Sequence, residues 1–106
     1  MNEQALIAEI RQRIVDQIHP ELLVLFGSRA RGDACEDSDV DLLVVMETDA
    51  KPSHRALPIR KVLRDIPVSK DVVVYTLEEF QSWLPASASL PSRAVAEGVE
   101  LYRRVA

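Results

Sequence analysis

With 106 residues, 47% of them hydrophobic and 28% charged, the chain has the size and composition of one soluble globular domain. Its net charge of −4 argues against a dedicated nucleic-acid binder, because such proteins neutralise phosphates with basic faces. A single cysteine, Cys35, permits no internal disulfide, and no apolar run is long enough for a membrane span or a signal peptide, so we expect a cytoplasmic protein.

A first helix is predicted over residues 3–18, where isoleucines recur at helical spacing. Pro20 prevents this helix from continuing, and His19 before the proline is biased towards extended backbone. The apolar run Leu22–Phe26 then predicts a buried strand.

Gly27 permits a sharp turn after this strand, and a short helix is expected over roughly residues 29–32. Ser28 has two interpretations: it caps that helix, or it belongs to a phosphate site built from backbone N–H groups. A Walker A motif is excluded, because Asp33 and Ala34 stand where that motif needs Lys followed by Ser or Thr.

Two carboxylates, Asp39 and Asp41, stand at the start of the second apolar run, Val40–Met46, which predicts another buried strand. Because side chains alternate along a strand, both carboxylates project from the same face. Two ionised carboxylates at the mouth of an apolar strand repel each other and are costly unless a cation neutralises them. Their oxygen atoms favour a divalent cation, with Mg²⁺ as the first choice. Because Asp39 and Asp41 follow Ser28 in the sequence, we favour the phosphate-binding interpretation of Ser28 over the helix cap.

The second half of the chain begins with a polar linker, after which a helix is expected over Arg55–Arg64. Pro58 makes the first turn of that helix doubtful. Lys70–Tyr75 alternates as a strand does, and Asp71 lies near its start.

Thr76 and Glu79 have the spacing of a capping box at the start of a further helix. The Pro85–Pro91 stretch is expected to be flexible, and Gly98 is expected to close the last helix as its C′ residue. The elements expected in this part are helices over Leu77–Leu84 and Ser92–Glu97 and a strand over Val99–Tyr102. The whole order predicts one α/β (α+β) domain, residues 1–106, with a single sheet flanked by helices.

Gly27-Ser28, ten intervening residues and then Asp-x-Asp resemble the signature of the DNA-polymerase-β-like nucleotidyltransferases. The strings GSRARG, from Gly27, and SDVDL, from Ser38, are similar to the minimal nucleotidyltransferase branch of small prokaryotic proteins. The resemblance continues weakly through DVVV, from Asp71, and EGVELY, from Glu97. It implies a palm-like mixed β-sheet.

The resemblance also implies roles for individual residues. Asp39, Asp41 and Asp71 are the expected catalytic and metal-binding carboxylates, with two Mg²⁺ ions held between them. Asp71 would also activate the acceptor hydroxyl; the simpler alternative is a charge at a strand edge. The expected nucleotide-binding residues are Gly27, Ser28, Arg31 and Ser38. Arg29 could also contact the nucleotide phosphates or balance the carboxylates, but an exposed surface charge explains it equally well.

Members of this branch often pair with a HEPN-domain toxin, which implies an antitoxin that transfers AMP from ATP to a hydroxyl of that partner. Trp83, Leu84 and Leu90 are a candidate docking patch, although Trp83 is equally well explained as core packing. Two alternatives stay open: a binding-only antitoxin without transfer activity, and a nucleotidyltransferase for small molecules such as aminoglycosides. We expect no membrane association and no dedicated nucleic-acid binding.

Overall fold

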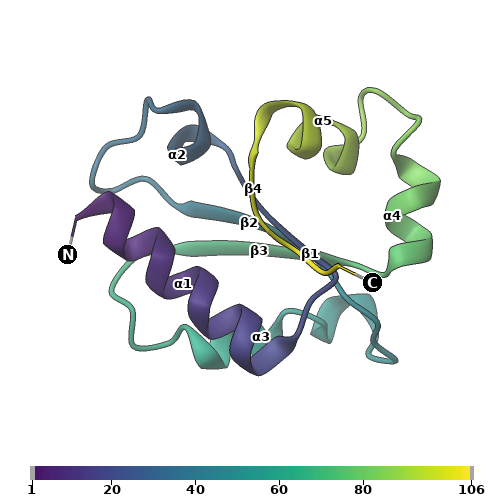
Figure 1. Cartoon of the computed structure of the whole chain (residues 1–106), viewed down its shortest axis with the longest axis horizontal. Helices are drawn as coiled ribbons and strands as arrows, with labels where there is room; N and C mark the ends of the chain where they lie inside the picture. Colours follow the sequence, from purple (N-terminus) through teal and green to yellow (C-terminus); the bar gives the residue numbers. More distant parts are fainter. Residues whose placement is uncertain (1, 106) are drawn as a thin grey trace.

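The structure, a computed structural model, describes residues 2–105 as a four-stranded sheet with helices on both faces (Figure 1). The helices are α1 (Glu3–Ile18), α2 (Ser28–Arg31), η1 (Pro52–His54, a 3-10 helix), α3 (Leu57–Val62), α4 (Leu77–Trp83) and α5 (Leu90–Glu97). The strands are β1 (Leu22–Phe26), β2 (Val40–Val45), β3 (Lys70–Tyr75) and β4 (Val99–Arg103). The predicted fold class is confirmed. No helix within residues 2–105 is long and apolar enough to cross a membrane.

The strands lie in the order β3-β2-β1-β4, so the sheet is mixed. Strand β1 runs antiparallel to both β2 and β4, whereas β2 and β3 are parallel and begin at the same edge. In this register Asp41 pairs with Phe26 on one side and with Asp71 on the other. The two strands that carry the predicted carboxylates are therefore direct neighbours.

Each face of the sheet buries its own hydrophobic cluster, as the alternation of strand side chains requires. One cluster packs α1 and α3 against the sheet and includes Ile10, Leu42 and Ile59. The other lies beneath α4 and α5 and includes Leu43 and Phe80. Figure 1 shows α1 and α3 below the sheet and α5 above it. Since β1 and β2 are buried on both faces, they are apolar almost throughout.

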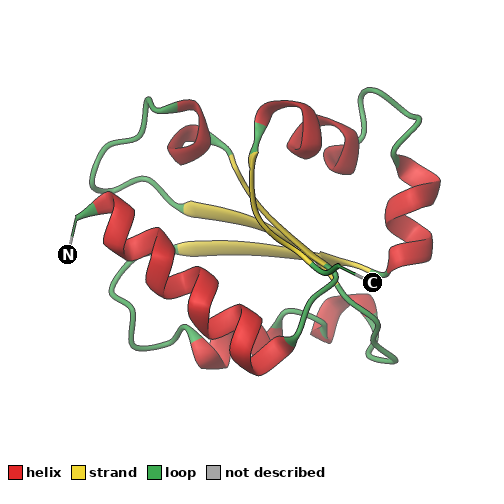
Figure 2. Cartoon of the chain, in the orientation of Figure 1, coloured by secondary structure: helices red, strands yellow, loops and turns green. Residues whose placement is uncertain are grey.

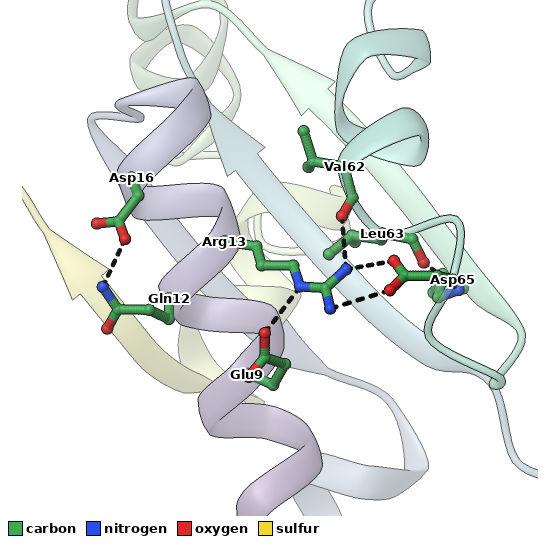
Figure 3. Close-up of polar contacts among 8 residues, drawn as sticks. Glu9, Gln12, Arg13, Asp16, Val62, Leu63 and Asp65 are labelled. Carbon is green, nitrogen blue, oxygen red and sulfur yellow. Dashed lines mark hydrogen bonds and ion pairs between the residues drawn. The ribbon is translucent and has the colours of Figure 1, made fainter.

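Arg13 ties α1 to the segment that follows α3 (Figure 3). Its guanidinium donates to the Glu9 carboxylate at 2.8 Å, to the Val62 carbonyl at 3.0 Å and to the Asp65 carboxylate in a two-pronged contact. The Arg13 guanidinium holds the pKa of the Asp65 carboxyl below its usual range. This contact therefore holds α1 against the end of α3 and the turn after it.

Several helix ends differ from the sequence prediction. His19 is not extended: it adopts the left-handed conformation, with φ of 56°, and its N–H donates to the Ile14 carbonyl as α1 ends. The predicted helix over Arg55–Arg64 is shorter in the structure, where α3 covers only Leu57–Val62, with Pro58 in its first turn. The 3-10 helix η1 precedes it, in a segment for which no helix was predicted. The capping box of Thr76 and Glu79 is confirmed.

Helix α5 begins at Leu90 rather than at Ser92, because the Ser89 hydroxyl caps it by accepting the Ser92 N–H. Gly98 closes the helix as predicted, but as its C-cap residue rather than its C′ residue, and with extended backbone at φ of −90°. Glycine is needed there for space, since a Cβ would lie 2.6 Å from the Leu25 carbonyl oxygen.

Candidate functional site

Three carboxylates lie at the edge of the sheet where β2 and β3 begin. Asp41 and Asp71 are direct partners across the parallel ladder, and Asp39 precedes β2 by one residue. Asp41 and Asp71 each lie two residues before a member of the cluster beneath α4 and α5, Leu43 and Val73 respectively, so they face the same side of the sheet as that cluster. Asp39 and Asp71 are exposed, whereas Asp41 is half-buried.

Asp41 is the carboxylate whose charge is most costly. Burial raises the pKa of the Asp41 carboxyl above its usual range, and the negative charges of Asp71 and then Asp39 raise it further. Arg31 acts in the opposite direction but does not cancel these effects. Four of the residues selected from the sequence are thus close enough to influence one another electrostatically.

The turn after β1 fits closely around Asp41. Gly27 has φ of 76°, a region that side-chain-bearing residues rarely adopt. A Cβ at Gly27 would overlap the Asp41 carboxylate, so the Asp41 side chain occupies the space that the missing side chain leaves. Glycine is therefore required here for two reasons: the backbone has a positive φ, and any side chain would overlap the Asp41 carboxylate.

Ser28 is not the cap of α2, which removes one of its two interpretations. Gly27 is the N-cap residue, its carbonyl accepts the Ala30 and Arg31 N–H groups at 3.1 Å, and Ser28 is the first helical residue. No side-chain hydrogen bond caps this helix. The predicted phosphate role of Ser28 is neither supported nor contradicted by this placement.

The other two predicted nucleotide-binding residues differ in how they are held. Arg31 is half exposed and donates to Asp33 at a long 3.3 Å, which leaves its guanidinium available. The Ser38 hydroxyl points into its own loop, where it accepts the Cys35 N–H at 3.0 Å. The same hydroxyl lowers the pKa of the Cys35 thiol. In this arrangement Ser38 shapes the loop before Asp39.

Arg29 is the residue whose role the sequence did not reveal. Its side chain is only 5% exposed and forms an ion pair with Glu3 of α1. It also donates to the Ser38 carbonyl, from Nη2 at 2.7 Å and from Nε at 3.1 Å, and to the Glu36 carbonyl at 3.3 Å. Arg29 thus fixes the loop that leads to Asp39. Figure 2 shows the segment between α2 and β2 as loop, in green. Because its partners lie 7 to 26 residues away, no local pattern signals this role.

Two hollows flank α2. The larger, about 640 Å³, lies on the α1 side and is lined by residues such as Leu6, Arg29 and Val68. The smaller, about 340 Å³, lies between α2 and α5 and is bordered by Phe26, Gly27 and Arg31. Only the smaller hollow borders the turn that holds Asp41, so it is the one relevant to the carboxylates.

The donor set suits a hard cation, because the clustered charge on Asp39, Asp41 and Asp71 is only partly balanced and all the ligand atoms are oxygens. Across residues 2–105, however, no three His, Cys, Asp or Glu side chains are gathered in an arrangement that could hold a metal ion. A cation bound by these carboxylates would therefore need further oxygen ligands from another source.

Comparison with known sequences identifies a protein family that this chain matches over most of its length. A family model described as a nucleotidyltransferase domain matches residues 7–99. In Methanocaldococcus jannaschii, "Putative protein adenylyltransferase MJ1305" is 54% identical over 44 residues, which are 42% of this chain and 28% of that protein. "Putative protein adenylyltransferase MJ0604" of the same organism is 39% identical over 51 residues, 46% of this chain and 51% of that protein. The chain thus spans about half the length of these relatives, or less.

Solved structures share the fold. One described as a "putative nucleotidyltransferase from Sulfolobus solfataricus" aligns with a TM-score of 0.64 at 24% identity, covering 94% of this chain and 79% of that one. A "toxin-antitoxin with AMP-PNP" aligns with a TM-score of 0.63 at 20% identity, covering 97% and 75%. The "toxin-antitoxin MntA-HepT" aligns with a TM-score of 0.60 at 19% identity, covering 96% and 74%.

Proposed function

Since this chain belongs to the nucleotidyltransferase domain family, we propose that it transfers a nucleoside monophosphate, AMP from ATP, to a hydroxyl group on a protein partner. The names of the two archaeal relatives, both protein adenylyltransferases, support a protein as the acceptor. The neighbour that was solved with AMP-PNP supports an adenine nucleotide as the donor.

One observation carries the proposal: a half-buried carboxylate, Asp41, packs against a glycine turn and shares its sheet edge with Asp39 and Asp71. Placing a partly buried carboxylate beside two others destabilises its ionised form, so this arrangement does not contribute to the stability of the fold. Such clustering is typical of sites whose charge is balanced by a bound ligand.

Mg²⁺ fits the site if the nucleotide completes its coordination, because Mg²⁺ is usually held by one or two carboxylates together with substrate phosphates. Asp39 and Asp41 are the proposed carboxylates for two such ions, with Asp71 as a further ligand to one of them. When bound, the ions would supply positive charge to the phosphoryl oxygens. Because residues 2–105 contain no ready three-ligand group, Asp71 would have to move towards Asp39 and Asp41 when the nucleotide and its ions bind.

In the proposed reaction the acceptor hydroxyl oxygen bonds to the α-phosphorus of ATP, and the bond from that phosphorus to the β-phosphate oxygen breaks. Pyrophosphate leaves, and the hydroxyl proton passes to the Asp71 carboxylate. Gly27, Ser28, Arg31 and Ser38 are the proposed contacts for the nucleotide, with Arg31 directed at its phosphates. The protein contributes mainly positioning and charge neutralisation.

A toxin is the proposed partner, by analogy with the toxin–antitoxin pairs among the structural neighbours. We propose that the toxin carries a HEPN domain and that this chain is its antitoxin. The proposed docking patch is accessible at two of its three residues: Trp83 is 53% exposed and Leu90 is 37% exposed, while Leu84 packs partly against the cluster beneath α4. Exposed aromatic and aliphatic residues are typical anchors of such interfaces.

The test is transfer from ATP labelled on its α-phosphate, with Mg²⁺, to a candidate HEPN protein encoded beside this chain. We expect AMP mass on the partner, and a loss of more than about 100-fold in rate for Asp39→Asn or Asp41→Asn. The matched control is Asp49→Asn, which removes an exposed loop carboxylate away from the site.

Unchanged transfer in Asp39→Asn or Asp41→Asn would refute the carboxylate roles. Neutralisation of the toxin without label, equally good with both aspartates replaced, would show a binding-only antitoxin. Label found on an aminoglycoside and never on a protein would show a small-molecule enzyme instead.

A further inference from the structure

The hollow between α2 and α5 has a cationic rim. Its walls come from the turn after β1 and from α5, and its volume is about 340 Å³, within the range of small-molecule sites. Arg31 lies on the α2 wall, and Arg93 and Glu97 lie on the α5 wall. Figure 1 shows α2 at the end of β1 and α5 at the start of the neighbouring β4.

This hollow continues into the carboxylate site. Phe26 lines it and is the register partner of Asp41, and cross-strand partners in an antiparallel pair point to the same face. Gly27 also lines it and contacts the Asp41 carboxylate. A ligand in the hollow would therefore extend directly towards Asp41.

Neither arginine is committed to a strong partner. Arg93 is 67% exposed, and its Nε lies 3.8 Å from Glu97, beyond hydrogen-bond distance. Arg31 is 54% exposed and makes only a long contact to Asp33. Arg29, by contrast, is almost fully buried in its contacts. Two lightly held guanidinium groups on opposite walls of one hollow suit an anionic ligand with several oxygens.

We propose that the hollow between α2 and α5 receives the polyphosphate of the donor nucleotide, with Arg93 as a second phosphate-binding cation opposite Arg31. This inference rests on the proposed function, because it places the β- and γ-phosphates of the same ATP donor in this hollow. It also places Arg93 on the pyrophosphate that leaves. Glu97, on the same wall, opposes the bound charge.

The test is calorimetric titration of the full chain with Mg²⁺-ATP, with tripolyphosphate and with adenosine, for wild type, Arg93→Gln, Arg93→Lys and Glu97→Gln. The matched control is Arg103→Gln, since Arg103 also pairs with a glutamate on its own element, Glu100, but lies at the far end of β4. Melting curves check that each variant is folded, as the exposure of Arg93 leads us to expect.

Arg93→Gln should weaken ATP and tripolyphosphate binding about tenfold, Arg93→Lys should retain part of the affinity, and Glu97→Gln should tighten binding. Arg103→Gln should match wild type, and adenosine binding should not respond to the Arg93 changes. The inhibition constant of pyrophosphate in the transfer assay should rise in Arg93→Gln.

If wild type binds ATP and transfers AMP while Arg93→Gln and Arg103→Gln bind tripolyphosphate equally well, the inference fails and the proposed function stands. Weaker adenosine binding with unchanged tripolyphosphate binding in Arg93→Gln would assign the hollow to the nucleoside and overturn the inference. A wild-type chain that binds neither ATP nor tripolyphosphate and transfers nothing would overturn both.

Discussion

At the scale of single residues, the site depends on how Asp41 and Gly27 fit together. Asp41 occupies the space beside Gly27 that any side chain at that position would need. The Gly27 backbone also has a positive φ, which only glycine adopts readily. Gly32, at the other end of α2, shares the positive φ but has open space where its side chain would be. A side chain at Gly32 would therefore cause backbone strain alone, whereas one at Gly27 would cause both strain and steric overlap.

Gly27→Ala should impair transfer much more than Gly32→Ala, because only the first change displaces the Asp41 carboxylate. Gly32→Ala should cost about 1–2 kcal/mol of stability from left-handed strain alone and leave the carboxylates in place. Chemical unfolding and the rate of AMP transfer measure the two effects separately. Equal losses of activity in both variants would show that strain, and not the position of Asp41, limits the site.

Asp41→Asn should stabilise the ligand-free protein at neutral pH. The pKa of the Asp41 carboxyl is raised in the folded state, so as pH rises Asp41 ionises first in the unfolded chain. Between the pKa of the unfolded chain and that of the folded state, the free energy of unfolding therefore falls as pH rises. Asp41→Asn does not lose stability in this way, so it should be more stable than wild type at neutral pH but not below pH 3.8, the ordinary pKa of an aspartate. Unfolding free energies measured against pH test this. An advantage that persists unchanged in acid would rule out ionisation as its source.

At the scale of elements, the short helix α2 and the loop after it act as one unit that delivers Asp39. Arg29 connects α2 to α1 through Glu3 and to the loop through the carbonyls of Glu36 and Ser38. Ser38 adds its own hydrogen bond to the Cys35 N–H. The loop has no strand pairing of its own between α2 and β2, so these contacts determine its path.

Arg29→Ala should release the loop and slow transfer, because it removes hydrogen bonds from a buried charged group that are worth about 1.5–3 kcal/mol. Hydrogen exchange of the amides in residues 33–38 should speed up. Glu3→Gln is the matched control, since it weakens the ion pair and leaves the Ser38 and Glu36 bonds intact. Loop exchange that is the same in wild type and Arg29→Ala would exclude this positioning role.

At the scale of the whole molecule, the mixed sheet brings the segments of the candidate site together. Strand β1 ends in the glycine turn, and the antiparallel β2 returns beside it with Asp41 opposite Phe26. The parallel β3 then places Asp71 beside Asp41 at the same edge. A ligand at this edge would therefore contact β1, β2 and β3 together.

Mg²⁺-ATP should therefore stabilise the whole fold. At a concentration about 100 times its dissociation constant, we expect about 2.7 kcal/mol of stabilisation and a rise in melting temperature of roughly 10–20 °C. The double variant Asp39→Asn with Asp41→Asn should show almost no rise, because it lacks the carboxylates proposed to bind the Mg²⁺. A rise of the same size in the double variant would show that the nucleotide binds without them.

Local and periodic signals in the sequence were enough to identify most elements. The bounds of α1, β1 and β3 agree with the prediction, because helical spacing, apolar runs and alternation are properties of neighbouring residues. The spacing of Gly27 and Ser28 from Asp39 and Asp41 likewise identified the family that the model match shows. All these signals lie within a short stretch of chain and need no knowledge of packing.

Contacts between distant segments were decided by the tertiary structure alone. The strand order and register, which bring Asp71 opposite Asp41, depend on how both faces of the sheet are covered. Arg29 is buried because α1 and the loop before β2 meet around it, and neither a phosphate contact nor a surface charge, the two roles considered from the sequence, describes this. Gly98 is required by the close approach of the Leu25 carbonyl, which belongs to a strand more than 70 residues away along the chain. Local propensity acts over a few residues, whereas these roles arise from packing, which couples residues regardless of their separation.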